Sequence, residues 1–180
     1  MYSTKIKSIL TIKRTAALLA LLCLIAVKMT GFTNAQSVTQ GYGAAETLQR
    51  GMIVGLIDDD ATKVESLNVD NLDRILGVVV APNDSPITLS DKNEKVFVAT
   101  VGRYEMLVSD QEGTVNPGEY VTASALNGIG MKATFEQSEI VGRALEKFDG
   151  TEGVVGTSKI KDTNGGDRVV SIGRIEIDIG

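Results

Sequence analysis

Two acidic segments contain the residue types that bind a metal ion. Asp162, Asn164 and Asp167 surround a glycine turn and offer the oxygen ligands that calcium prefers. The alternative is a hairpin, because Asn-Gly followed by Gly suits a tight turn and the bidentate Glu of a calcium loop is missing. The run Asp58 to Asp60 presents the same choice. We favour a solvent-exposed turn in both segments, and Asp162, Asn164 and Asp167 remain the calcium candidates.

Covalent catalysis has one formal candidate, a Ser-Lys dyad formed by Ser124 and Lys132 on neighbouring strands. Both residues also fit the plain alternation of exposed and buried positions in strands. The sequence contains no histidine, which excludes Ser-His-acid and Cys-His devices and His-ligated metal sites. We therefore predict that the protein is not an enzyme and binds no cofactor.

The N-terminal segment is typical of export. Residues 1–35 contain five basic and no acidic residues, and residues 15–27 form an unbroken neutral, mostly apolar run. The run is shorter than the roughly 20 residues of a transmembrane helix, so a signal peptide cleaved between Ala35 and Gln36 is predicted. Without cleavage, residues 15–27 would anchor the protein in the membrane, with the rest outside the cytoplasm. Both outcomes predict an extracytoplasmic domain, secreted or anchored.

Charge and cysteine content limit what the exported part can bind. Removal of residues 1–35 leaves 13 basic against 23 acidic residues, a balance of −10. This balance opposes binding to nucleic acid and to anionic lipid. The single cysteine, Cys23, lies in the export segment, so the mature domain has no disulfide and must be held by an apolar core.

Short β-branched runs separated by glycine and acidic turns predict an all-β domain, a small barrel or sandwich. The expected layout is an N-terminal signal or anchor helix over residues 1–35, a linker over 36–49 and a β domain over 50–180. A helical turn is expected only at Thr47–Arg50 or Val69–Arg74. The expected strands cover Met52–Ile57, Ile75–Val80, Ile87–Leu89, Lys95–Val101, Tyr104–Val108, Tyr120–Ala123, Met131–Ala133, Ile140–Leu145 and Arg168–Ile179.

Two segments share one sequence pattern, which we call the repeated device. Residues 74–80 and 139–145 each place a charge before two aliphatic residues, a glycine and a further mostly aliphatic run. We predict that Gly77 and Gly142 mark a bulge, a barrel corner or a close backbone approach. The alternative is that they let a ligand reach the backbone. Gly118 follows a proline and is predicted to form a turn that leads into a strand.

An ordered series of turn-and-strand motifs carries a resemblance to a known group. The motifs are GMIV at 51–54, LGVV at 76–79, FVATVGRY at 97–104, PGEYVTAS at 117–124, GMKA at 130–133 and VGRAL at 141–145. The series resembles a β module of exported bacterial proteins and, more distantly, the C-terminal domains of phage tail-fibre and appendage proteins. The resemblance implies a β fold with a display or assembly role. Some appendage relatives cleave themselves, but no matching cleavage residues are found here.

Three functions follow in order of preference. The first is a structural or interaction module of the cell exterior, with protein partners or self-association into a homo-oligomer. The second is a small-ligand or glycan binder, and a distant third is a self-processing hydrolase. Glycan binding would use aromatic side chains that otherwise belong to the core, namely Tyr42, Tyr104, Tyr120, Phe97, Phe135 and Phe148.

Overall fold

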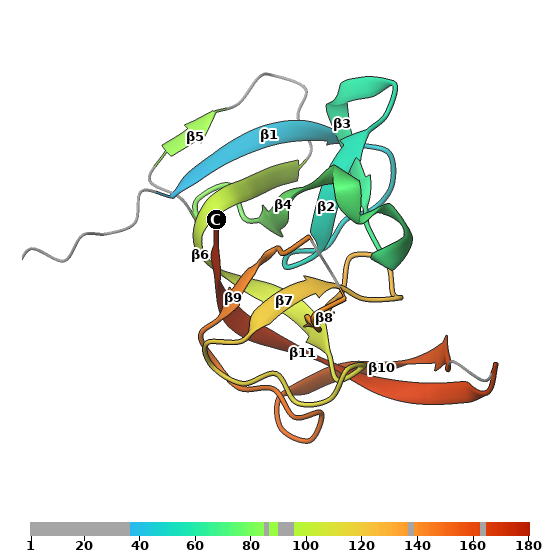
Figure 1. The fold of residues 1–180 in the computed structure, drawn as a ribbon. Helices are drawn as coiled ribbons and strands as arrows, with labels where there is room; N and C mark the ends of the chain where they lie inside the picture. Colours follow the sequence, from blue (N-terminus) through green and yellow to red (C-terminus); the bar gives the residue numbers. More distant parts are fainter. Residues whose placement is uncertain (1–36, 85–86, 90–95, 137–138, 163–164) are drawn as a thin grey trace, which may run out of the picture. The chain divides into compact units, whose positions relative to one another are not determined.

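The computed structural model describes residues 37–84, 87–89, 96–136, 139–162 and 165–180. These residues form an all-β domain with one short 3-10 helix (Figure 1). The elements are β1 (Val38–Ala44), β2 (Ile53–Ile57), β3 (Asp60–Ser66), η1 (Val69–Arg74), β4 (Ile75–Val80), β5 (Ile87–Leu89), β6 (Val96–Ser109), β7 (Tyr120–Ala123), β8 (Gly130–Lys132), β9 (Gly142–Ala144), β10 (Val154–Lys161) and β11 (Asp167–Ile179).

The strand pairings close into two rings that share β6. Ring A runs through β1, β3, β2, β4 and β6 and returns to β1. Ring B runs through β6, β8, β7, β9 and β11 and returns to β6. The short β5 pairs with β1, and β10 pairs with β11 (Figure 1). The long β6, with 14 residues, is therefore the last strand of ring A and the first of ring B.

The two rings repeat one arrangement. In each, the first strand along the chain is parallel to the third and antiparallel to the last, while the second is antiparallel to the third and fourth. The register agrees, because Val54 faces Gly77 and Ser66 in ring A, and Val121 faces Gly142 and Lys132 in ring B. The chain thus contains the same five-strand unit twice.

Backbone hydrogen bonds outside the strand ladders follow the same repeat. Gly51 N donates to Val79 O at 2.8 Å, and Gly118 N donates to Ala144 O at 2.7 Å. The amide of Leu67 donates to Ile53 O as the amide of Ala133 donates to Tyr120 O. We call residues with the same place in the two rings equivalent; the pairs used below are Ile53 and Tyr120, Leu56 and Ala123, Leu67 and Ala133, Asn68 and Thr134, Val69 and Phe135, Ile75 and Ile140, and Leu76 and Val141.

The all-β prediction is confirmed, and so is the helical turn at Val69–Arg74. The structure corrects the linker assignment for residues 36–49, because β1 lies within it. Its Gly-rich sequence conceals a strand that pairs with β3, β5 and β6. Strands β3 and β10 are additional to the predicted strands, and the two runs expected at 95–101 and 104–108 form the single strand β6. The predicted signal segment, with Ala35 and Gln36, lies outside the described residues.

Helices contribute little to the described part of the chain. Within these residues, no helix has the length and apolar character needed to cross a membrane.

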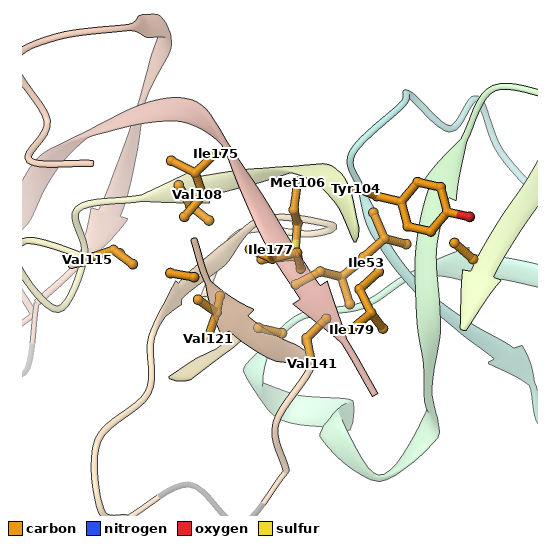
Figure 2. Packing of buried hydrophobic residues seen from close by; sticks show 14 of the residues in the cluster. Ile53, Tyr104, Met106, Val108, Val115, Val121, Val141, Ile175, Ile177 and Ile179 are labelled. Carbon is orange, nitrogen blue, oxygen red and sulfur yellow. The ribbon is translucent and has the colours of Figure 1, made fainter. Parts of the chain in front are cut away.

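The core consists of two apolar clusters. One fills ring A with residues such as Val54, Val79 and Val98. The other fills ring B with Met106, Ile177 and their neighbours, and it also takes in Ile53 from the outer side of ring A (Figure 2). The contact between the rings is therefore part of the main core rather than a separate surface contact.

The two glycines of the repeated device allow close backbone approach. A Cβ atom on Gly77 would lie 2.1 Å from Ala99 O in β6, and one on Gly142 would lie 2.4 Å from Asp178 O in β11. Both distances are far below van der Waals contact. Gly118 has a positive φ of 88°, a left-handed conformation in the turn before β7 that favours glycine. The repeated sequence pattern thus coincides with the repeated ring.

We predict that Tyr104→Phe does not destabilise the domain. The Tyr104 side chain is only 6% exposed, and its hydroxyl has no hydrogen-bond partner among the described residues. Because burying an unpaired hydroxyl costs about 1–3 kcal/mol, its removal should leave stability unchanged or raise it by up to about 1 kcal/mol. Thermal unfolding of the two proteins measures this. A loss of stability would show that the hydroxyl has a favourable interaction in the folded state.

Candidate interaction surface

An exposed apolar patch lies on ring B. It consists of Tyr120, Phe135 and Ile140, whose side chains are 51%, 96% and 38% exposed. We call these three residues the ring B patch. They line a groove of about 450 Å³ together with Glu119, Lys132, Ala133 and Thr134. A phenylalanine that is almost fully exposed beside other apolar side chains indicates a binding surface rather than part of the core.

The turn before β7 positions the patch. Glu119 N donates to Asn116 O at 3.1 Å, and Gly118 takes the left-handed conformation. The Glu119 carboxylate accepts hydrogen bonds from Lys132 Nζ and Asn116 N, both at 2.7 Å. The hydrogen bond from Lys132 contributes most to lowering the pKa of Glu119, and the hydrogen bond from the Asn116 backbone amide lowers it further. This ionised carboxylate ties the turn to β8 and fixes the start of β7, where Tyr120 begins the strand.

A cation borders the patch. The Arg143 guanidinium lies 4.7 Å from the centroid of the Tyr120 ring, and its Nη2 donates to Tyr120 Oη at 2.6 Å. A guanidinium near an aromatic ring is stabilised by the ring quadrupole. The ring B patch therefore combines apolar area with an accessible positive charge.

A second groove, of about 360 Å³, lies at one end of ring A. We call it the ring A groove; it is lined by Leu56, Ile57, Asp58, Ala61, Asp73, Arg74, Ile75 and Leu76. Arg74 Nη1 lies 2.8 Å from Glu65 Oε1 and 3.5 Å from Asp58 Oδ1, and it donates to Leu56 O. These contacts hold the turn between β2 and β3 against η1, and they leave aliphatic side chains partly open.

A third groove, of about 420 Å³, is mainly polar and is lined by Arg50, Asp84, Arg103, Tyr104, Glu105, Glu146 and Glu176. Arg50 forms ion pairs with Asp84 at 3.2 Å and Glu105 at 3.6 Å. Exposed ion pairs of this kind contribute little and are screened by salt. The groove is therefore a solvated charged surface with its basic and acidic groups already paired in part.

The predicted calcium residues lie in the hairpin between β10 and β11. Asp162 Oδ1 accepts from Gly166 N at 2.8 Å, and Asp167 pairs with Lys161 across the hairpin. Asn164 lies outside the described residues. No group of three or more acidic or cysteine side chains in the described ranges is arranged to hold a metal ion. The two described carboxylates serve the turn, and calcium binding stays a prediction.

Asp60, in the other acidic segment, provides a pH prediction. Hydrogen bonds from Lys63 and then Thr62 lower the pKa of Asp60 to about 2. A lowered pKa in the folded state stabilises the fold above the unfolded pKa of about 3.9, and this stability is lost as the pH falls toward 2. We expect Asp60→Asn to make the melting temperature fall less steeply between pH 5 and pH 2.

Thermal unfolding across that pH range measures the effect, with Asp59→Asn in the same turn as the control. Equal slopes for Asp60→Asn and the unmodified protein would contradict the role of the Asp60 carboxylate.

The candidate dyad is not brought together as a catalytic pair. Lys132 Nζ donates to Glu119, whereas Ser124 Oγ accepts from Leu126 N at 3.1 Å. The two side chains therefore have separate structural partners.

The six aromatic residues considered for glycan binding divide into two groups. Tyr42, Tyr104 and Phe148 are buried and Phe97 is partly buried in the core. Only Tyr120 and Phe135 are exposed. The sequence contains the signal for the patch, an apolar Phe135 in a polar segment before Ile140, but its position beside Tyr120 depends on the pairing of β7 with β8 and β9.

Comparison of the chain with protein-family models, curated proteins and solved structures gave no match.

Proposed function

We propose that this protein is an exported, non-enzymatic β domain with a structural or interaction role at the cell exterior. It acts as a display or assembly module that is released by cleavage after Ala35 or held in the membrane by residues 15–27. The ring B patch carries the proposal, because an apolar groove containing a 96% exposed Phe135 gains free energy only when a partner covers it.

The scaffold supports such a role. We interpret the two rings as small barrels, in which closure leaves few strand edges open for uncontrolled pairing. A closed scaffold of this kind presents its surface features at fixed positions. The resemblance to tail-fibre and appendage modules agrees with display or assembly. The acidic balance of the mature chain disfavours nucleic acid as the partner.

Glycan or small-ligand binding is the second candidate, and the same groove favours it. Tyr120 and Phe135 expose aromatic faces, and Arg143 and Lys132 offer hydrogen-bond donors nearby. Sugar rings stack on aromatic faces of this type. The proposals differ in the partner, since a glycan site is filled by a soluble sugar and an interaction site by a protein surface.

Photocrosslinking at the patch distinguishes the two candidates. The photoreactive amino acid p-benzoylphenylalanine replaces Phe135 in the protein produced in an exporting host, and the products are identified by mass spectrometry. We expect a protein adduct that is absent when the probe replaces Val155, which is exposed on β10. The proposal fails if no protein adduct forms. Binding of a panel of envelope glycans to the unmodified protein but not to Phe135→Ala would then support the glycan candidate.

A further inference from the structure

The internal repeat shows what covers the equivalent of the ring B patch. In ring A the equivalent residues are Ile53, Val69 and Ile75. Ile53 is fully buried and Ile75 packs, partly buried, against the main core, whereas the Val69 side chain stays 36% exposed. The same places in ring B hold Tyr120, Phe135 and Ile140, which are exposed. The position of Ile53 is therefore covered in the first copy of the unit, and the same position, held by Tyr120, is open in the second.

The covering element is the loop from Ser124 to Ile129, between β7 and β8. Gly128 O accepts from Ile53 N at 2.9 Å, Gly128 N donates to Leu67 O at 2.6 Å, and Ser124 O accepts from Val69 N at 2.8 Å. A side-chain bond of 2.7 Å joins Asn68 Nδ2 to Asn127 Oδ1. This intramolecular contact defines how one unit docks on the next.

The equivalent docking element also exists in ring A, which has no preceding ring among the described residues for it to cover. The turn between β2 and β3 is equivalent to the loop between β7 and β8, because each connects the second strand of its ring to the third. This turn borders the ring A groove. Leu56 and Leu76 in that groove are partly exposed, whereas their equivalents Ala123 and Val141 are buried where ring A meets ring B.

We propose that the partner of the ring B patch is the ring A groove of a second copy of this chain. The contact reproduces, between two molecules, the packing of ring A on ring B within one molecule. It thereby covers both open apolar surfaces at once. The inference rests on the proposed function as an interaction module and names its partner.

Charge complementarity supports this pairing. The turn between β2 and β3 carries the exposed carboxylates of Asp58 and Asp59. The ring B patch is bordered by the exposed Arg143. Docking of the turn on the patch brings these opposite charges to the same interface, where they favour the encounter of the two copies.

The contact joins two different surfaces and is therefore heterologous. An open assembly has one uncovered ring A groove and one uncovered ring B patch at its ends. Heterologous contacts generate a ring if the rotation closes and an open filament if it does not. Copies are therefore added until the two ends of the assembly meet in a closed ring.

Cysteine crosslinking tests the predicted docking. Asn68 contacts Asn127 within one molecule, and the equivalent of Asn68 is Thr134, which follows Ala133. The equivalent of Asn127 is Ala61, because Asn127 lies three residues before Gly130 and Ala61 lies three residues before Val64, the equivalent of Gly130. Thr134 of one copy and Ala61 of another should therefore meet in the proposed contact. Thr134→Cys and Ala61→Cys are made in separate proteins, each with Cys23→Ala. The two proteins are mixed, oxidised by air and separated without reductant.

We expect at least about 10-fold more mixed disulfide than from Thr134→Cys mixed with Thr157→Cys, whose second site is exposed on β10. Equal yields would overturn the proposal. If the yields are equal and the Phe135 photoprobe still captures a protein, self-docking fails and the interaction role survives with another partner. If neither an excess of the mixed disulfide nor a protein adduct of the Phe135 photoprobe forms, both proposals fail.

Discussion

Replacing either glycine of the repeated device by alanine is expected to destabilise the domain by about 3 kcal/mol or more. In Gly77→Ala the new methyl group would lie 2.1 Å from Ala99 O, and in Gly142→Ala it would lie 2.4 Å from Asp178 O. The obstacle is backbone of a paired strand, which cannot move without breaking the ladder to β6 or β11. Chemical denaturation of each protein measures the change.

The control for this prediction is Gly156→Ala in β10. A Cβ atom there meets no atom within 4 Å, and the φ of Gly156 is not in the left-handed region. Its effect should stay within about 0.5 kcal/mol. Gly77→Ala or Gly142→Ala with a loss as small as the control would show that the strands do not approach as closely as the structure places them.

The second large effect concerns Phe148 and Gly173. The buried Phe148 ring lies over Gly173, where a Cβ atom would be 2.2 Å from Phe148 Cε2. Phe148→Ala should cost about 3–5 kcal/mol through lost burial and the cavity that remains. Gly173→Ala should cost about 2 kcal/mol or more in the unmodified protein because its methyl group overlaps the ring.

A double-mutant cycle gives this prediction its control. In the Phe148→Ala background, Gly173→Ala should be nearly neutral, because the methyl group then enters the space that the ring occupied. The unfolding free energies of the two single variants and the double variant give the coupling. Strictly additive losses would contradict direct packing of Phe148 on Gly173.

Much of the fold was predictable from local pattern. The β-branched runs between glycine turns identify most strands, and the alternation from Ile175 to Ile179 correctly buries its isoleucines. The matching glycines Gly77 and Gly142 also mark the repeated device in the amino-acid sequence itself. These features are predictable because each depends on residues close together in the chain.

The strands that local pattern does not identify depend on distant pairing. The sequence of β1 contains small and polar residues, and its position between β3 and β6 makes it a strand. Strand β3 begins at Asp60 within an acidic turn, and β10 has mostly exposed residues with one neighbour, β11. Local composition does not specify such strands, because tertiary pairing provides their stability.

The candidate surface was only partly predictable. The aromatic residues are visible in the sequence, but burial separates Phe148 from Phe135 only after the rings form. The equivalence of Tyr120 with Ile53 depends on strand register, since the two residue types differ. Because equivalent positions hold different residue types, the amino-acid sequence does not reveal the full extent of the repeat. It does not reveal the open patch on ring B either.

The most direct test of the account is the mass of the protein recovered from an exporting host, measured by light scattering over a range of concentrations. We predict a mass that rises with concentration above that of one chain. Phe135→Ser should abolish this rise while leaving the melting temperature unchanged, because Phe135 is exposed. A monomer at every concentration, or an oligomer of any size that Phe135→Ser does not affect, would contradict the proposed docking of ring B on the ring A groove.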